Sequence, residues 1–518
     1  MTEAPGTAQS TDKTRSAETG ASDLKNAAVL SIGHGVVMAL GGVLALLIAH
    51  VFGKNDQTDA LFTAYGVYGI AVIFGQTLRL TAIPRIVGER DWEVTDRLVA
   101  AILAIALLAA LPMVAFAGPL GGLLAPNDPG HVAAESLRLL WPAVAGQLVI
   151  GLLAAVLVVH GRFNVIGVGY SVSGVMSIAV FLLLHGSIGI KAIPVALDAS
   201  SLTVAVMFVV SLVRGGWRPR IHDYIDVRAI TKDVVELGYA SASFVANNLG
   251  YVISLAIAAR IGAGEATIYA YAYFSAALLV ATTAVSAAMA RAPGMLEHAD
   301  PAAAAADNAR SGYVFTLVVL APVFALAAVV GPAVLDFLLG PKFTGGDAGQ
   351  LVATLFALSG WVLASAAGVF AVVHLLNERR FRALAVIALI QTAILPVMAI
   401  AGREIGIEGV AAAQSLSLVV ATVAQLRAGF GSETPRILAG IFTATLRAVV
   451  VAGIAVIPGI FLVDAAGDGL VALTGAAAVT LLIALGLTRL AWPQQSQVLT
   501  RAAAGALGRG RPMPSPAG

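Results

Sequence analysis

Residues 136–160 read SLRLLWPAVAGQLVIGLLAAVLVVH, and their only Asp, Glu, Lys or Arg side chain is Arg138, near the beginning. A helix needs about 20 predominantly apolar residues to cross the hydrocarbon core of a bilayer. We therefore predict that this stretch spans a membrane. The same criterion selects further stretches on both sides of it: 27–51, 59–84, 98–118, 163–186, 190–213, 233–259, 266–290, 311–339, 350–376, 383–402, 406–426, 438–463 and 469–491.

The composition agrees with a membrane protein. Hydrophobic residues make up 59% of the 518 and charged residues only 12%, with a mean hydropathy of +0.90. Soluble proteins carry about 25% charged residues, so too few are present to cover soluble domains of this length. The absence of cysteine excludes disulfides and thiolate metal sites, and the net charge of +2 does not indicate nucleic-acid binding. The predicted fold class is an all-α integral membrane protein with about 14 transmembrane helices and no cofactor.

The basic residues predict the orientation of these spans. Lys and Arg are enriched in cytoplasmic loops. If the N-terminus is cytoplasmic, 23 of the 31 basic residues fall on the inside and 6 on the outside, and Arg79 and Arg447 lie within spans. The bias predicts a multi-pass protein of the cell inner (plasma) membrane with both termini in the cytoplasm.

Short segments recur in the two halves of the chain. The pairs keep the same order and are about 208 to 218 residues apart, which predicts two six-helix lobes related by a pseudo-twofold along the membrane normal. The pairs are Ile48-Ala49-His50 with Ile257-Ala258-Ala259, Gly161-Arg162-Phe163 with Arg379-Arg380-Phe381, and Gly189-Ile190-Lys191 with Gly406-Ile407-Glu408.

The repeat and the loop charges predict the domain organisation. Two similar lobes imply a cleft between them and alternating access by rocking, as in a transporter. The predicted parts are a disordered cytoplasmic tail (1–26), an N-lobe (27–213), a charged cytoplasmic linker (214–232), a C-lobe (233–427), two further C-terminal spans (428–491) and a second cytoplasmic tail (492–518).

The first hairpin carries a recognisable motif. Phe52-Gly53 followed by Thr58-Asp59-Ala60-Leu61-Phe62 resembles the FG-x4-TDAFF motif of the MviN/MurJ family, within the multidrug/oligosaccharidyl-lipid/polysaccharide exporter superfamily. Ala82-Ile83-Pro84 is similar to the family's F-V-P, and the stretch from Gly331 to Asp347 resembles the segment between spans nine and ten. The resemblance implies fourteen helices. It also implies a flippase that moves polyprenyl-pyrophosphate-linked saccharides, such as the peptidoglycan precursor lipid II, to the outer leaflet.

The sequence departs from this family where the cargo would bind. Lipid II flippases carry cavity arginines on span one and at the beginning of span eight, which suit a pyrophosphate. Here the matching stretch of span one, 36–47, has no arginine, and 270–274 reads AYAYF. Arg79 and Arg260 are then the candidate basic residues of the cavity, with His34 as a titratable partner. We therefore expect this chain to share the fold of the family, whereas the resemblance supports lipid II as its cargo less strongly.

Further candidates are polar residues within spans, because ionisable groups at membrane depth are costly and usually face a cavity or a partner. Asp198, in span six, is predicted to be a proton or cation site or a structural pair. Asn247 and Asn248, in span seven, are predicted either to face the cleft or to bond between helices. Asp59 either caps its helix or helps to close the outer gate. The candidate cavity and gating set is His34, Asp59, Arg79, Asp198, Asn247, Asn248 and Arg260.

Three functions stay open from the sequence. The first is a flippase for lipid II or another cell-envelope glycan precursor, with membrane lipid around it, H⁺ or Na⁺ as candidate coupling ions and cell-wall synthesis proteins as candidate partners. The second is an ion-coupled small-molecule or drug exporter of the same superfamily, and the third a non-transporting scaffold for cell-wall assembly. An enzyme is not expected, because the predicted outer loops are short and the longest, 118–135, offers only Asp128 and Glu135 as acids.

Overall fold

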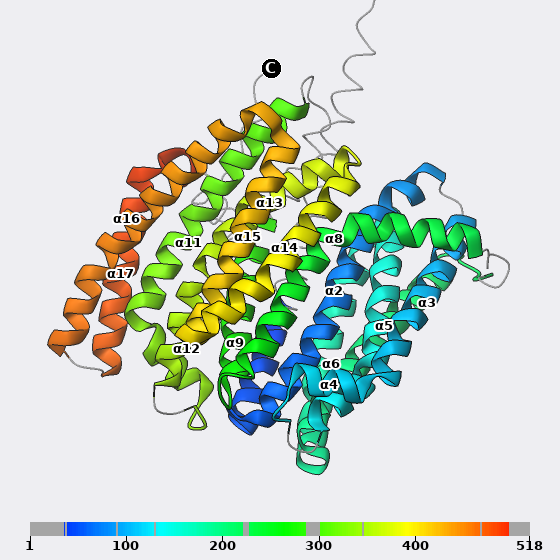
Figure 1. The fold of residues 1–518 in the computed structure, drawn as a ribbon, viewed down its shortest axis with the longest axis horizontal. Helices are drawn as coiled ribbons and strands as arrows, with labels where there is room; N and C mark the ends of the chain where they lie inside the picture. Colours follow the sequence, from blue (N-terminus) through cyan, green and yellow to red (C-terminus); the bar gives the residue numbers. More distant parts are fainter. Residues whose placement is uncertain are drawn as a thin grey trace, which may run out of the picture. The chain divides into compact units, whose positions relative to one another are not determined.

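The computed structural model describes residues 36, 39–89, 92–128, 131–220, 227–285, 301–343, 346–466 and 469–496, and the regular elements in these ranges are all helices (Figure 1). The predicted N-terminal tail and His34 lie outside the described residues. In chain order the helices are Ala39–Phe52, α2 (Asp56–Glu89), α3 (Trp92–Ala115), α4 (Ala117–Leu124), α5 (Val132–Val159), α6 (Phe163–Ile188), η2 (Gly189–Lys191), α7 (Ala192–Arg214), α8 (Val227–Ala258), α9 (Glu265–Val280), η4 (Ala281–Val285), α11 (Pro301–Leu339), α12 (Asp347–Ala357), α13 (Ser359–Asn377), α14 (Phe381–Gly402), η5 (Arg403–Ile405), α15 (Ile407–Phe430), η6 (Gly431–Glu433), α16 (Thr434–Ala466) and α17 (Leu470–Ala491).

These helices form a multi-pass membrane fold. Within the described residues, ten helical stretches are long and apolar enough to cross a bilayer. Two of them, Phe163–Arg214 and Ile407–Ala465, each contain two of the predicted spans, with a break between the two helices. The all-α membrane class is confirmed, and the count of fourteen stays a prediction.

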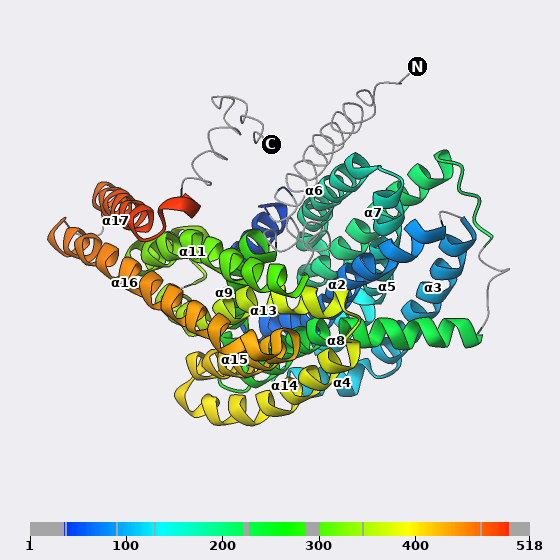
Figure 2. The same ribbon diagram turned by 90° about the horizontal axis from the view of Figure 1, so that it is seen from above.

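Glycine sets the closest helix contact in the first half of the chain. A Cβ atom on Gly151 of α5 would lie 2.3 Å from the Gly75 carbonyl oxygen of α2, and one on Gly75 would lie 2.6 Å from the Gln147 carbonyl oxygen. Small residues let helix backbones approach in a membrane, where van der Waals packing replaces the hydrophobic effect. Figure 2 shows α2, α5 and α7 side by side, and their contact continues into a core with α3 around Ile150 and Phe208.

The contacts divide the chain into two compact units. The first contains the beginning of the first helix, up to Ile48, and continues from Asn55 through α8; the second contains Ala49–Lys54 and everything from α9 onward. Helix α8, which the sequence assigned to the C-lobe, packs against α2 and belongs to the first unit. Contact units and sequence repeats are different divisions of the chain, so the predicted lobes 27–213 and 233–427 stay a prediction.

The linker between the predicted lobes begins with a buried anchor. The Trp217 indole N–H donates to Asp96 Oδ1 of α3 at 2.8 Å, and the Arg220 backbone N–H donates to Asp96 Oδ2 at 3.1 Å. The Asp96 and Trp217 side chains are both 3% exposed. A buried carboxylate with two donors is well satisfied, so the start of the linker is fixed to α3.

A carboxylate also fixes the beginning of α5. Asp128 lies in the segment between α4 and α5, outside the spans, and accepts hydrogen bonds from the backbone N–H groups of Val132 at 2.7 Å and Ala133 at 2.8 Å. These are donors that a helix leaves without internal partners. Burial nevertheless raises the pKa of Asp128 above 3.8, and the two backbone donors offset this only in part. Asp128, one of the two acids of the longest predicted outer loop, therefore binds the N-terminal backbone of a helix.

The raised pKa predicts a pH dependence for Asp128→Asn. A carboxyl group with a higher pKa in the folded state binds protons better when folded, so its contribution to stability falls as the pH rises from about 3.8 through the folded pKa. Asparagine does not titrate. We expect the thermal midpoint of Asp128→Asn, relative to the wild-type protein, to be higher at about pH 7 than at about pH 4. A difference that does not change with pH would contradict the raised pKa.

Candidate functional site

Asp198, on α7, lies half-buried opposite a proline in α5. Pro142 has no N–H group and disturbs the hydrogen bonds of the turn around it. Asp198 Oδ1 accepts a hydrogen bond from the backbone N–H of Ala143, the next residue, at 2.8 Å. Of the two predicted roles, the structure supplies a structural partner, and that partner is a backbone group instead of the expected hydroxyl or basic side chain.

A second polar contact lies one turn further along the same helices. Gln147 Nε2 of α5 donates to the Tyr68 hydroxyl of α2 at 2.9 Å and to Ser201 Oγ of α7 at 3.2 Å. Together with the contact of Asp198, these bonds connect α2, α5 and α7 through one polar layer in an otherwise apolar bundle. Such buried layers rigidify a core when each member has a partner.

The second unit contains a counterpart of the Asp198 contact. Ser415 Oγ of α15 accepts a hydrogen bond from the Trp361 backbone N–H at 3.0 Å and donates to the Ala357 carbonyl at 2.7 Å. These residues lie at the break between α12 and α13. Ser415 and Trp361 lie about 218 residues after Asp198 and Ala143, the offset of the sequence repeat.

The arginine of the repeated Arg-Phe motif makes the same contact in both halves. Arg162 Nη1 donates to the Ser211 carbonyl at the end of α7, and Arg380 Nη1 donates to the Ala428 carbonyl near the end of α15. Two equivalent contacts at one offset support an internal repeat. They also indicate that Asp198 and Ser415 have in common the binding of a backbone N–H group of a neighbouring helix, and that the negative charge is particular to the first half.

This comparison predicts the behaviour of two variants at position 198. Asp198→Asn keeps an oxygen that can accept the Ala143 N–H, so we expect a thermal midpoint close to that of the wild-type protein. Asp198→Ala leaves the buried N–H unsatisfied, which costs about 1–3 kcal/mol. Thermal unfolding of the purified variants measures the difference. Equal destabilisation by both variants would mean that the charge of Asp198, and not its hydrogen-bond acceptor, stabilises the contact with α5.

The other candidates of the first unit make local contacts. Asn248 Nδ2 donates to the Phe244 carbonyl of its own helix at 3.1 Å, and Asn247 is half-buried beside it. Arg260, at the end of α8, donates to the carbonyls of Ala256 and Leu123 and so connects α8 to α4. These contacts account for Arg260 structurally, and none of them brings the three candidates together.

The capping role considered for Asp59 belongs to another residue. Helix α2 begins at Asp56, and Asn55 Oδ1 accepts from the backbone N–H groups of Gln57 at 2.9 Å and Thr58 at 3.1 Å. Capping by Asp59 is therefore wrong, because the helix begins three residues earlier than the predicted span. Asp59 is 3% exposed and lies in the first turn of α2. A carboxylate there interacts favourably with the positive end of the helix dipole. Arg79 also lies on α2, and its side chain is not among the described ones.

An ion cluster that the sequence did not predict lies in the second unit. Lys54 Nζ, after the first helix, is 3.1 Å from Asp347 Oδ1 of α12 and 3.5 Å from Glu265 Oε1 of α9. Gln350 completes the cluster, because its Nε2 donates to Glu265 Oε2 at 2.9 Å. The three charged side chains are only 15–16% exposed. We call this set of four residues the Lys54 cluster; it joins one end of three helices on the predicted outer side.

Tyrosines occupy the positions where the resemblance implies arginines. Tyr271 and Tyr273 of α9 are 7% and 5% exposed. The Tyr273 ring lies 4.9 Å from the Trp361 ring, and Tyr271 meets Phe343 edge to face at 5.9 Å. Both side chains are packed inside the second unit, so this part of α9 presents no cation to a ligand.

Solved structures provide the comparison with known proteins. No protein-family model and no curated protein sequence matches this chain. A structure of the lipid II flippase MurJ in an inward closed conformation matches with a TM-score of 0.69 and 14% identity, covering 91% of this chain and 99% of that one. An inward-facing multidrug resistance MATE transporter matches at 0.56 and 17%, covering 78% and 94%, and a MOP superfamily transporter from Pyrococcus furiosus at 0.56 and 17%, covering 80% and 96%. The chain has the fold of these transporters.

Proposed function

We propose that this protein is a flippase that moves a polyprenyl-pyrophosphate-linked saccharide from the inner to the outer leaflet of the cell membrane. The observation that carries the proposal is the structural similarity to a lipid II flippase over 91% of this chain and 99% of that one. The motif of the first hairpin points to the same family. In this proposal the membrane is the inner (plasma) membrane, and both termini are cytoplasmic.

The proposed mechanism is alternating access between the two predicted lobes. A transporter with repeats exposes its site alternately by rocking one repeat against the other. The paired contacts of Arg162 and Arg380, and of Asp198 and Ser415, support a repeat of this kind. The polar head of the cargo would cross in a cavity while its polyprenyl tail stays in lipid, with H⁺ or Na⁺ as the candidate coupling ion. No bond is made or broken in such a cycle, so we propose a transporter and not an enzyme.

The cargo is the least constrained part of the proposal. The buried tyrosines of α9 and the arginine-free stretch 36–47 argue against the arrangement of arginines found in lipid II flippases. We therefore propose a cell-envelope glycan precursor on a polyprenyl carrier, either lipid II or another member of that class. The candidate set of His34, Asp59, Arg79, Asp198, Asn247, Asn248 and Arg260 stays a proposal for the cavity and its gates.

An ion-coupled drug exporter is the alternative, because multidrug MATE transporters share the fold at TM-scores up to 0.56. That match covers 78% of this chain against 91% for the flippase. Reconstitution distinguishes the two. We expect purified protein in liposomes to move a fluorescent polyprenyl-pyrophosphate saccharide between leaflets, and native mass spectrometry to detect a co-purified polyprenyl lipid. Drug transport without lipid transport would favour the exporter, and neither activity would favour the scaffold.

A further inference from the structure

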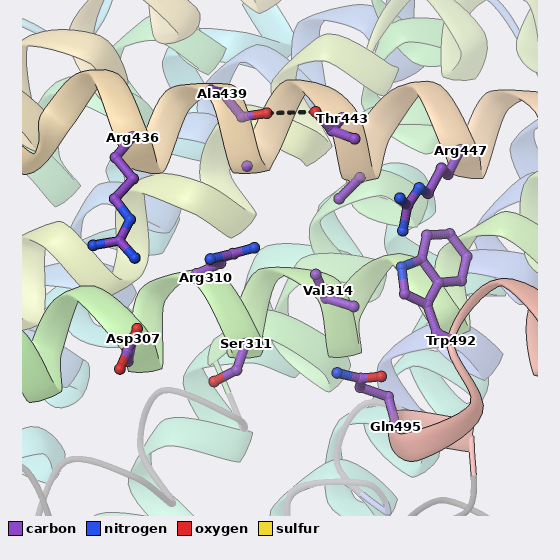
Figure 3. Close-up of a pocket in the computed structure, with 12 residues that line it drawn as sticks. Asp307, Arg310, Ser311, Val314, Arg436, Ala439, Thr443, Arg447, Trp492 and Gln495 are labelled. Atoms are coloured by element: carbon purple, nitrogen blue, oxygen red, sulfur yellow. Dashed lines mark hydrogen bonds between the residues drawn. The ribbon is translucent and has the colours of Figure 1, made fainter.

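A basic cavity lies within the second unit, in the region of the last two spans (Figure 3). It has a volume of about 710 Å³ and is lined by α11, α16 and the segment that follows α17. Figure 3 shows the side chains of Arg310, Arg436 and Arg447 gathered along it, and Arg447 points from α16 toward the indole of Trp492. None of these residues belongs to the candidate cavity or to the Lys54 cluster.

The hairpin of α16 and α17 indicates the depth of this cavity in the membrane. The two helices are joined by a short connection and pack against each other along their length. Helix α17 has 22 residues, which at 1.5 Å per residue spans about 33 Å, close to the thickness of the hydrocarbon core. Counting back 22 residues from the end of α16 reaches Thr445, two residues before Arg447. Arg447 and Trp492 therefore lie at one level, and tryptophan after a span marks the interface with water.

The described residues supply few anions to the arginines of this cavity. The lining contains one carboxylate, Asp307, and three arginines. In the part of the chain that the structure describes, no ion pair joins Arg310 or Arg447 to a carboxylate, and Arg436 is paired only with the exposed Glu433, at 3.7 Å. Basic residues close to the membrane interface attract anionic lipid head groups. The cavity thus offers at least two guanidinium groups to an external anion.

Apolar surface continues from the cavity into the predicted membrane. Val450 and Ile454, three and seven residues after Arg447, lie on the same face of α16 and are 51% and 49% exposed, and Phe461 further along is 69% exposed. In lipid such a face contacts hydrocarbon chains. An anionic group held by the arginines would therefore have a suitable surface for an attached acyl or prenyl chain, which a soluble anion would not use.

We propose that this cavity binds the phosphate group of a membrane lipid from the cytoplasmic leaflet, with Arg310, Arg436 and Arg447 as its ligands. Basic pockets between transmembrane helices on the cytoplasmic side are suited to anionic lipid head groups. Arginine presents several N–H donors in a planar fork, which fits phosphate oxygens. The site lies outside the predicted two-lobe cavity, so it is a second lipid site beyond the proposed transport path. It stands or falls independently of the cargo.

The test is a binding titration followed by native mass spectrometry on the full-length protein in detergent. The variant is Arg310→Gln/Arg436→Gln/Arg447→Gln. The matched control is Arg214→Gln/Arg382→Gln/Arg427→Gln, which removes the same charge at three exposed positions that are predicted to be cytoplasmic and do not line the cavity. The probes are phosphatidylglycerol, phosphatidylcholine, a polyprenyl phosphate and inorganic phosphate. Thermal midpoints without added lipid verify folding, and Arg447→Gln alone serves if the triple variant does not fold.

We expect the cavity variant to lose more than about tenfold in affinity for phosphatidylglycerol or for polyprenyl phosphate, and the control to lose much less. The lipid that shows the difference identifies the source of the phosphate. Equal losses in the cavity variant and the control would overturn the site, as would equal binding of phosphatidylcholine and phosphatidylglycerol together with no effect on polyprenyl phosphate. Inorganic phosphate that binds as tightly as the lipids would overturn a lipid ligand. Lipid transport is not a readout here, so these results do not depend on the proposed flippase activity.

Discussion

Lys54→Met is expected to destabilise the protein by about 3 kcal/mol, because it leaves two largely buried carboxylates without a counter-ion. Glu265 and Asp347 share the Lys54 ammonium group and are 15–16% exposed. Methionine keeps most of the length of the lysine side chain, so packing changes little. The loss should appear as a lower thermal midpoint of the purified protein. We also expect slower lipid transport, since the cluster holds the predicted outer ends of three helices together.

Lys191→Met is the matched control for this variant. Lys191 also pairs with a carboxylate on the predicted outer side, at 2.6 Å from Glu135, but the two side chains are 45% and 37% exposed. Exposed ion pairs contribute about 0–1 kcal/mol, so this variant should behave almost as the wild-type protein does. The double variant Lys54→Met/Glu265→Gln removes one of the two orphaned charges and should recover part of the lost stability. If Lys54→Met and Lys191→Met lowered the thermal midpoint by similar amounts, burial of the Lys54 cluster would not be the cause of the effect.

Gly151→Ala is the second variant from which we expect a large effect. The added methyl group would lie 2.3 Å from the Gly75 carbonyl oxygen, and 2.7 Å from the Gly75 carbonyl carbon and Cα. Because the obstacle is backbone, no side chain can rotate away, and α2 and α5 must separate. Overpacking of this kind costs about 1–3 kcal/mol or more. The measurement is the yield of monodisperse protein and its thermal midpoint.

Gly186→Ala provides the comparison for that variant. Gly186 lies in α6, and a Cβ atom built on it meets nothing within 4 Å. Alanine is favoured over glycine in a helix by about 1 kcal/mol, so this substitution should be neutral or stabilising. Opposite signs at the two positions would establish close backbone packing. A neutral result at Gly151 would instead mean that α2 and α5 tolerate a wider separation.

The sequence predicted the class of fold well because its signals are local. Long apolar stretches reflect the cost of burying polar groups in lipid, and they need no knowledge of tertiary contacts. The predicted repeat is supported by one pair of contacts, since Arg162 and Arg380 both precede a phenylalanine and make the same contact. The division of the predicted membrane helices into contact units was not visible. Helix α8 packs with the first unit through its contacts with α2. The hydrophobic periodicity of a single sequence does not indicate which of two neighbouring units a helix packs against.

The candidate site was harder to predict, because a polar residue in a span can face a cavity, bond to a neighbouring helix or bond to its own helix. Asp198 was singled out as an acid within a span, but the sequence does not show that its partner is the backbone N–H of Ala143, next to Pro142. The Lys54 cluster was missed, since Asp347 lies 293 residues after Lys54 in the chain and each member lies near a span end, where charges are ordinary. The spacing from Gly331 to Asp347 was noted for its resemblance alone. A search for basic and acidic residues at the ends of neighbouring spans on one side of the membrane could have found it.

The membership of Ala49–Lys54 in the second unit has a consequence for work with fragments of the gene. A fragment that begins at residue 261 contains every later helix, yet it lacks the lysine that neutralises Glu265 and Asp347. The second unit is thus not encoded by one continuous stretch, and a C-terminal half cut near residue 260 would be incomplete on its own. A functional split would have to leave the first hairpin covalently joined to one half and supply it to the other by association in the membrane.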